Sequence, residues 1–99
     1  MHVISRKRLL EAGKKHGQLA VQLDSWYRTA RSARWTSLGD VRGTYPAADG
    51  VPVGDKVYTV FNISGNAFRL VTPIFYADQA ILVRQVLTHA EYDRGDWKK

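Results

Sequence analysis

Apolar residues recur at helical spacing over residues 18–34, a stretch that contains neither glycine nor proline. Five of them fall at positions i, i+4, i+7, i+11 and i+14, and they are Leu19, Leu23, Trp26, Ala30 and Ala33. This spacing aligns them along one face of an amphipathic helix. The pattern predicts a helix over 18–34 that buries this stripe against a core.

A shorter strand and helix are expected before it. Residues 2–5 predict a brief strand, and Ser5 suits the cap of a following helix that carries Leu9 and Leu10. The glycines of segment 13–17 predict a turn. We interpret the first third of the chain as a short strand followed by two helices packed as a hairpin.

The pattern changes abruptly after the second helix. Four glycines and two prolines punctuate residues 36–56, which is the chemistry of a loop. A structureless loop of ~20 residues is uncommon in a small domain, so this segment is expected to pack down or to serve the function.

The remaining chain has the character of strands. Residues 56–63 are β-branched and aromatic, and 67–76 and 80–88 follow after turn signals at 64–66 and 77–79. Short connections of this kind favour an antiparallel meander of three strands.

These elements predict an α+β fold in which two helices cover one face of a small antiparallel sheet. The short N-terminal strand joins the sheet, and the other face stays at least partly open as a concave surface. Because domains usually run ~50–250 residues, the 99 residues are expected to form one domain, 1–99.

Charge separates the two halves of the chain. The net charge is +6, and residues 1–42 hold nine Lys/Arg against three Asp/Glu, whereas 43–99 hold six of each. This excess favours a polyanionic partner, with nucleic acid as the first candidate, although charge alone does not separate this from a solvated helical surface or from a face that pairs with an acidic protein. The chain has no cysteine, which excludes disulfides and thiol chemistry. We expect a cytoplasmic protein without a signal peptide or membrane segment.

Polar side chains occur within the expected strands. Lys56 and Asn62 share a face of the first long strand, and Asn66 and Arg69 follow across the turn. Arg84 interrupts an otherwise apolar strand, so it must reach solvent, a partner or a substrate. The structural alternatives are an edge residue whose guanidinium extends to solvent, or an ion pair of Arg84 with Asp78 or Glu91.

Segment 88–93 holds the densest chemistry. His89 can act as acid or base near neutral pH, and Tyr92 shares its face if the segment is helical. A structural alternative is that Thr88 and Glu91 form a capping box, and both interpretations can hold together. A metal site of His89, Glu91 and Asp93 is weakly supported, and the half-motif of a zinc deaminase lacks its cysteines.

Two motifs at this separation resemble a known family. Residues 60–71 read VFNISGNAFRLV and residues 86–93 read VLTHAEYD. Together they resemble the HigB family of bacterial toxins, within the RelE-like superfamily. Trp35, segment 45–49 and the opening residues 1–4 are also similar to it.

The resemblance implies the toxin of a type II toxin–antitoxin system, with a RelE-like fold. Such a toxin is a metal-independent mRNA endoribonuclease, an mRNA interferase that often acts in the ribosomal A site. Its partners are mRNA and a helix-turn-helix, HigA-like antitoxin, with no cofactor. The rival function is a basic RNA- or DNA-binding module without catalysis. A third possibility is that residues 1–42 bind an acidic antitoxin.

The resemblance also assigns roles to individual residues. Arg69 would bind the scissile phosphate, His89 would be the leading acid or base, and Tyr92 would assist it or stack on a base. The residues that would hold the RNA are Lys56, Asn62, Asn66 and Arg84. This chemistry requires Arg69 and His89 to converge on one phosphodiester.

Overall fold

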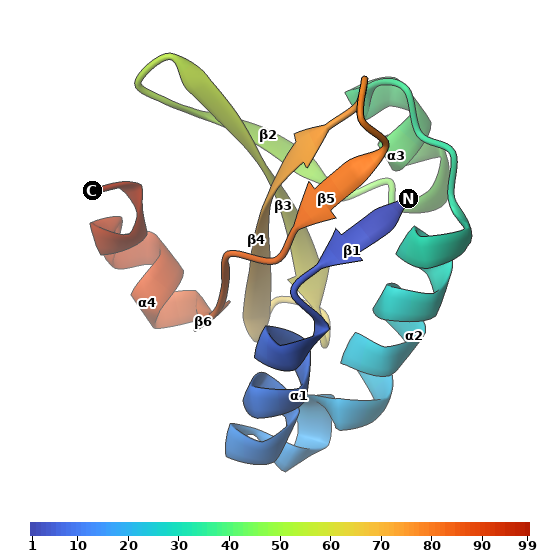
Figure 1. Ribbon diagram of the computed structural model, residues 1–99. Coiled ribbons are helices and arrows are strands. Elements are labelled where there is room, and N and C mark those ends of the chain that lie inside the picture. The colour runs from blue at the N-terminus through green and yellow to red at the C-terminus, as the bar shows by residue number, and fades with distance from the viewer.

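Helices and strands separate into layers in the computed structural model, which describes residues 1–99 (Figure 1). The helices are α1 (Arg6–Lys15), α2 (Ala20–Ser32), α3 (Leu38–Thr44) and α4 (His89–Arg94), with short 3₁₀ turns η1 (Gly17–Leu19) and η2 (Asp96–Lys98). The strands are β1 (His2–Ile4), β2 (Asp49–Val53), β3 (Lys56–Ile63), β4 (Phe68–Phe75), β5 (Ala80–Leu82) and β6 (Gln85–Thr88). The expected α+β class is confirmed.

The helical stripe forms the main core. Leu19, Leu23, Trp26 and Ala30 are buried together with side chains from one face of the sheet. The Trp26 ring meets Phe61 of β3 edge to face, with centroids 5.4 Å apart. The predicted helix 18–34 is therefore present, although it begins at Ala20 after a 3₁₀ turn.

The first two helices approach closely at Gly13. A Cβ atom there would lie 3.3 Å from the Cα of Ala20, so a larger residue would push the helices apart. Gly13 lies inside α1, and the expected turn starts only at His16, whose N–H donates to the Ala12 carbonyl. Because Gly13 has no side chain, α1 can pack closely against the start of α2.

The sheet is mixed, which corrects the expectation of an antiparallel sheet. The strand order is β1-β5-β4-β3-β2, and β6 also pairs with β4. Strand β1 joins the sheet as expected, but it runs parallel to β5, while all other pairs are antiparallel.

The expected strand 80–88 is two strands. Strand β5 pairs with Ile74 and Phe75, and β6 pairs with residues 68–71 farther along β4. The break falls at Val83 and Arg84, where the Arg8 guanidinium of α1 donates to both carbonyls. The Arg8 side chain is therefore the partner of these two carbonyls, whereas the Val83 and Arg84 N–H groups still donate to Ile4 and to Val71.

The prediction of a loop over 36–56 is wrong for most of this segment, because it contains α3 and β2. Ser37 caps α3 by accepting a hydrogen bond from the Asp40 N–H at 3.3 Å. Pro52 is compatible with β2 because β2 is an edge strand. Gly50 lets β2 approach α3, since a Cβ there would lie 3.0 Å from Leu38.

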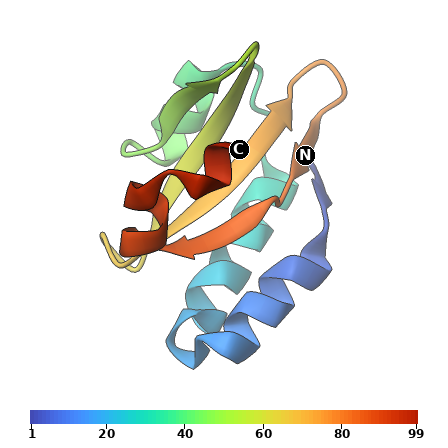
Figure 2. The same cartoon turned by 90° about the vertical axis from the view of Figure 1, so that its left-hand side faces the viewer.

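The second face of the sheet is partly covered by the C-terminal segment. Trp97 of η2 is buried against Val60 of β3 and Val71 of β4. Figure 2 shows α4 and the C-terminus in front of the sheet, opposite α1 and α2. No helix has the length and apolar content needed to cross a membrane.

Candidate active site

The pairing of β4 with β6 brings the two sequence motifs together. Arg69 of β4 lies opposite Leu87 of β6 and, on its other side, opposite Asn62 of β3. Helix α4 starts directly after β6, and the His89 N–H donates to the Ala67 carbonyl at 2.9 Å. Register and helix start therefore place His89 beside Arg69.

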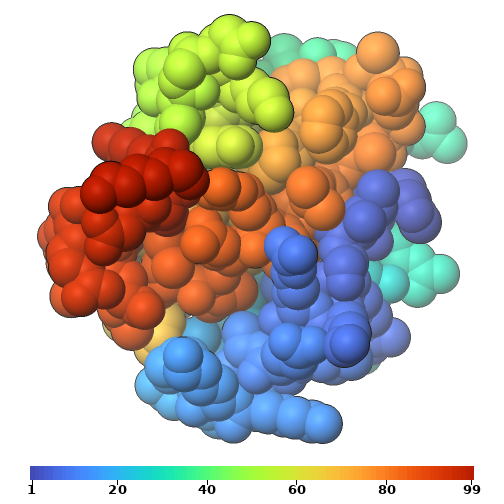
Figure 3. Space-filling model, turned by 60° about the vertical axis from the view of Figure 1, so that its left-hand side comes forward, coloured from blue at the N-terminus to red at the C-terminus, as the bar shows by residue number.

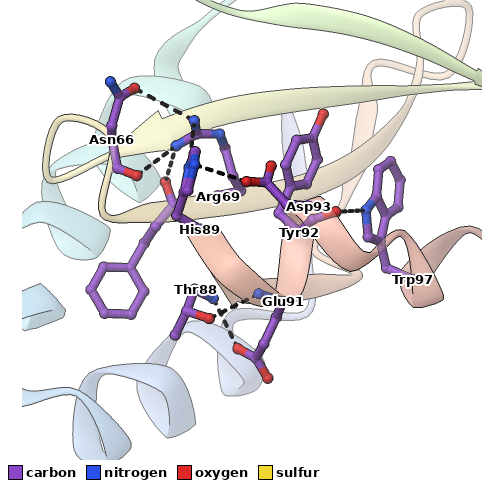
Figure 4. Close-up of polar contacts among 9 residues, drawn as sticks. Asn66, Arg69, Thr88, His89, Glu91, Tyr92, Asp93 and Trp97 are labelled. Carbon is purple, nitrogen blue, oxygen red and sulfur yellow. Dashed lines mark hydrogen bonds and ion pairs between the residues drawn. The ribbon is translucent and has the colours of Figure 1, made fainter.

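The His89 ring is held from both sides (Figure 4). A guanidinium nitrogen of Arg69 lies 3.2 Å from Nδ1, and a carboxylate oxygen of Asp93 lies 2.9 Å from Nε2. Arginine can only donate, so Nδ1 accepts and Nε2 carries the proton that is donated to Asp93. The geometry therefore selects the neutral tautomer with its lone pair toward Arg69.

Backbone contacts near the β3–β4 turn fix Arg69. Its guanidinium donates to the carbonyl oxygens of Asn66 and Phe68, at 3.1 and 3.2 Å, and to the Asn66 side chain at 3.5 Å. It also lies 5.5 Å from the centre of the Tyr92 ring. No carboxylate pairs with this guanidinium within 4.0 Å, which leaves its charge for an anionic ligand.

Tyr92 stands on an aromatic platform. Its ring stacks on Trp97 with centroids 5.1 Å apart, and the Trp97 indole N–H donates to the Tyr92 carbonyl at 3.0 Å. Burial raises the pKa of the Tyr92 hydroxyl above its usual value; Asp49 adds to the rise and Arg69 opposes it. The hydroxyl therefore keeps its proton and is suited to donate rather than to act as a base.

The capping box predicted from the sequence is present. The Glu91 N–H donates to the Thr88 hydroxyl at 3.1 Å, and the Thr88 N–H donates to the Glu91 carboxylate at 2.9 Å. This backbone hydrogen bond lowers the pKa of Glu91. The box fixes the start of α4 and with it His89, and it commits Glu91 to a structural contact rather than to a shared site with His89 and Asp93.

A hollow of about 500 Å³ lies beside Arg69 and Tyr92. Besides these two and Asn62 of β3, its lining includes Arg42 of α3 and Asp49 of β2. Arg42 donates to the Ala48 carbonyl at 3.0 Å and lies 3.7 Å from Asp49. Sequence reasoning did not assign Arg42 and Asp49 to the site because it placed them in a loop; the signals were the excess of positive charge for Arg42 and the family resemblance of segment 45–49 for Asp49.

Lys56 and Arg84 lie apart from this site. They line a second hollow of about 520 Å³ with Arg8 and Tyr58. Arg84 donates to the Trp97 carbonyl at 2.6 Å and sits 4.9 Å from the Tyr58 ring centre. The alternative of an ion pair with Asp78 or Glu91 was wrong, since neither carboxylate pairs with Arg84.

The structure thus divides the predicted site residues into two sets. Arg69, His89, Tyr92 and Asn66 are gathered where β4 meets α4, with Asn62 on the neighbouring strand. Asp93 was not among the predicted catalytic residues, although its spacing of four from His89 was a readable signal for a helical pair. The arrangement places a guanidinium and an imidazole side by side where β4 meets α4.

Comparison with known proteins gives one consistent family. Residues 19–95 match the family model described as HigB toxin, RelE-like toxic component of a toxin-antitoxin system. The chain is 33% identical over 93 residues to the mRNA interferase toxin HigB of Escherichia coli K12, covering 94% of this chain and 88% of that protein. The mRNA interferase HigB of Shigella flexneri gives the same values.

A further relative extends this match. The mRNA interferase HigB of Escherichia coli O6:H1 is 29% identical over 94 residues, which cover 95% of this chain and 90% of that protein. The family model and the first two relatives each span most of the chain, including both motifs and the residues gathered around His89. This chain belongs to the HigB family of RelE-like toxins.

Proposed function

We propose that this chain is the toxin of a type II toxin–antitoxin system and inhibits translation as an mRNA endoribonuclease. The relatives that it matches over most of their length are named mRNA interferases. The observation that carries the proposal is the contact of Arg69 with His89 at 3.2 Å. Cleavage of a phosphodiester by its own 2′-hydroxyl requires a base, an acid and a cation for the developing charge, and an imidazole beside a fixed guanidinium can supply a base and the cation.

In the proposed reaction the 2′-oxygen attacks the adjacent phosphorus and the bond to the 5′-oxygen breaks. Arg69 binds a non-bridging oxygen and stabilises the charge of the transition state. Once the phosphate engages Arg69, the lone pair on Nδ1 of His89 is free to accept the 2′-hydroxyl proton, and Asp93 stabilises the resulting imidazolium. The products are a 2′,3′-cyclic phosphate and a 5′-hydroxyl.

The leaving 5′-oxygen needs a proton. The Tyr92 hydroxyl stays protonated because burial raises its pKa, and the ring stands within reach of the Arg69 guanidinium. We assign Tyr92 as the partner of His89, either as proton donor or as a stacking surface for a base. This scheme uses neither a metal nor a cofactor.

The two hollows give the RNA two points of attachment. Asn62 and Asn66 lie beside Arg69, whereas Lys56 and Arg84 lie at the other hollow. Asn62 lies six positions after Lys56 in β3, which is about 20 Å at ~3.3 Å per residue. An RNA of several nucleotides would contact both sets, so Lys56 and Arg84 would hold the strand outside the cleavage position.

The finer parts of the proposal follow from the family. We infer a RelE-like fold, a helix-turn-helix, HigA-like antitoxin as inhibitor, and mRNA in the cytoplasm as substrate, cut on or off the ribosome. The helices α1 and α2 on one face of the sheet support the fold. The antitoxin is expected because the family is the toxic component of a two-protein system.

The test uses a defined RNA oligonucleotide and the purified chain in the presence of EDTA, with and without ribosomes. We expect fragments with 5′-hydroxyl and 2′,3′-cyclic phosphate ends, and no fragments with H89A or R69A. RNA binding that weakens with salt but yields no fragment in either condition would instead establish a non-catalytic nucleic-acid-binding module.

A further inference from the structure

An apolar groove lies on the outer surface between α1 and α2, the two helices that run side by side in Figure 1. Its volume is about 310 Å³, and Leu9, Leu10, Leu23 and Tyr27 supply most of its apolar lining. Leu9 and Leu23 reach down to the core, but the Leu10 residue is 55% exposed. The groove has no role in the chemistry proposed above.

The rim of this groove is positively charged. Arg6 and Lys14 of α1 line the groove together with Asp24 of α2. Lys7 precedes Lys14 by seven positions, and Arg28 and Arg31 follow Asp24 and Tyr27 by four, so these three cations flank the same sides of the two helices. Arg8 and Lys15 line another hollow, beside Arg84, and do not contribute to this rim. Asp24 is itself compensated, because Arg28 lies 2.9 Å and Arg6 lies 3.9 Å from its carboxylate. The groove therefore combines an apolar floor with a rim that carries an excess of positive charge.

We propose that this groove is the docking site for an acidic amphipathic helix of the antitoxin. A helix seated between two helices inserts apolar side chains at i, i+3, i+4 and i+7, and its acidic residues meet the basic rim. An RNA strand fits the floor less well, because phosphates gain nothing from leucine side chains. This inference rests on the proposed function, since it takes the antitoxin as the partner.

The position of the groove has a functional consequence. Figure 3 shows the orange surface that precedes α4 lying between the start of α1, in dark blue, and α4, in red. The groove lining shares no residue with the hollow beside Arg69 and Tyr92. Antitoxin binding here would anchor the partner without touching His89, so an interface change should separate antitoxin affinity from RNA cleavage.

The experiment compares L10D with V21D. Leu10 lines the groove, whereas Val21, 80% exposed on α2, does not, so the pair matches an apolar-to-acidic change inside and outside the groove. The probe is the protein encoded beside this chain that restores growth when both are expressed. Its affinity for each purified variant is measured by titration calorimetry, and RNA cleavage by each variant is measured alone.

We expect L10D to lose at least about tenfold in affinity for the antitoxin, whereas V21D matches the native chain and both cleave RNA normally. Equal affinity of the two variants would overturn the inference, as would a loss of cleavage in folded L10D, which would assign the groove to RNA. A native dimer that L10D dissociates would assign it to a second copy. Failure to find any neighbouring protein that binds the chain would also overturn it. Because the affinity is measured without RNA, failure of the native chain to cleave RNA would contradict only the proposed activity.

Discussion

A guanidinium nitrogen of Arg69 lies 3.2 Å from Nδ1 of His89, although the two residues are 20 positions apart in the chain. The contact is a product of strand register, since β4 and β6 pair Phe68 with Thr88 and Arg69 with Leu87. In this contact the Nδ1 lone pair of His89 faces the Arg69 guanidinium, and the Nε2–H group donates to the Asp93 carboxylate. In the proposed reaction, a bound phosphate competes for the Arg69 guanidinium and thereby frees the Nδ1 lone pair of His89.

The charge of Arg69 alone should not sustain cleavage. A lysine in its place keeps the charge but loses the planar fork that contacts His89 and the Asn66 backbone together. We expect R69K to lower kcat/KM for RNA cleavage by roughly 10²–10³-fold, the cost of one transition-state donor. The control is R94K, whose arginine lies 3.9 Å from Asp96 on the surface. Native-like cleavage by R69K would contradict the proposal that the Arg69 guanidinium binds the scissile phosphate through its planar fork.

Asp93 should act through His89 rather than on the RNA. We expect H89A to lose roughly 10²–10⁴-fold in cleavage, the usual contribution of an acid or base, and D93N to lose much less. D93N should lower kcat more than it changes KM, because the His89 ring then loses the carboxylate that orients it at 2.9 Å. D96N, which alters an exposed carboxylate nearby, serves as control. A native kcat for D93N would show that its contact with Nε2 has no part in the reaction.

The helical half of the fold could be predicted because its pattern is local. The stripe from Leu19 to Ala30 encodes both the helix and its buried face. The prediction of a loop over 36–56 was wrong because its glycines and prolines do not all mark turns. Gly50 permits close packing against Leu38, and Pro52 lies in the edge strand β2. Such contacts depend on partners outside the local sequence pattern. The split of residues 80–88 into β5 and β6 depends likewise on Arg8 from α1.

The site was predictable in its residue types more than in its geometry. Spacing along the chain placed His89 and Tyr92 on one short helix, and the Thr88–Glu91 box needed only local contacts. The partner of His89 across the sheet depends on the register of β4 with β6, which no local pattern encodes. The same register separates Arg84 from Arg69, so two arginines expected together lie in different hollows.

Trp97 should stabilise both the packing of the C-terminal segment on the sheet and the position of the Tyr92 ring. It is buried at 4% exposure, stacks on Tyr92 and accepts, through its carbonyl, a hydrogen bond from Arg84. We expect W97A to lower the free energy of unfolding by about 3–5 kcal/mol, as truncation of a buried aromatic does, and to reduce cleavage by displacing Tyr92. Urea denaturation and cleavage assays below the unfolding transition measure both effects, and W97F should restore most of each. Full stability of W97A would show that the C-terminal segment does not hold the sheet.

The Thr88–Glu91 box should make the stability of α4 depend on pH. The Thr88 N–H lowers the pKa of Glu91 in the folded chain below its ordinary value of 4.5. A carboxyl with a lowered folded pKa contributes stability that is present above the unfolded pKa and is lost as the pH falls through the folded pKa. We therefore expect E91Q to be less stable than the native chain at pH 7, with the difference vanishing in acid, and T88V to cost about 1 kcal/mol at pH 7 through loss of the cap. Urea unfolding at several pH values from neutral to acid measures the free energy of unfolding of each variant.

The control is E11Q, whose native carboxylate faces Lys7 at 3.9 Å on the surface, and it should differ little from the native chain at any pH. A deficit of E91Q that stayed constant down to low pH would mean that the negative charge of Glu91 does not stabilise the start of α4.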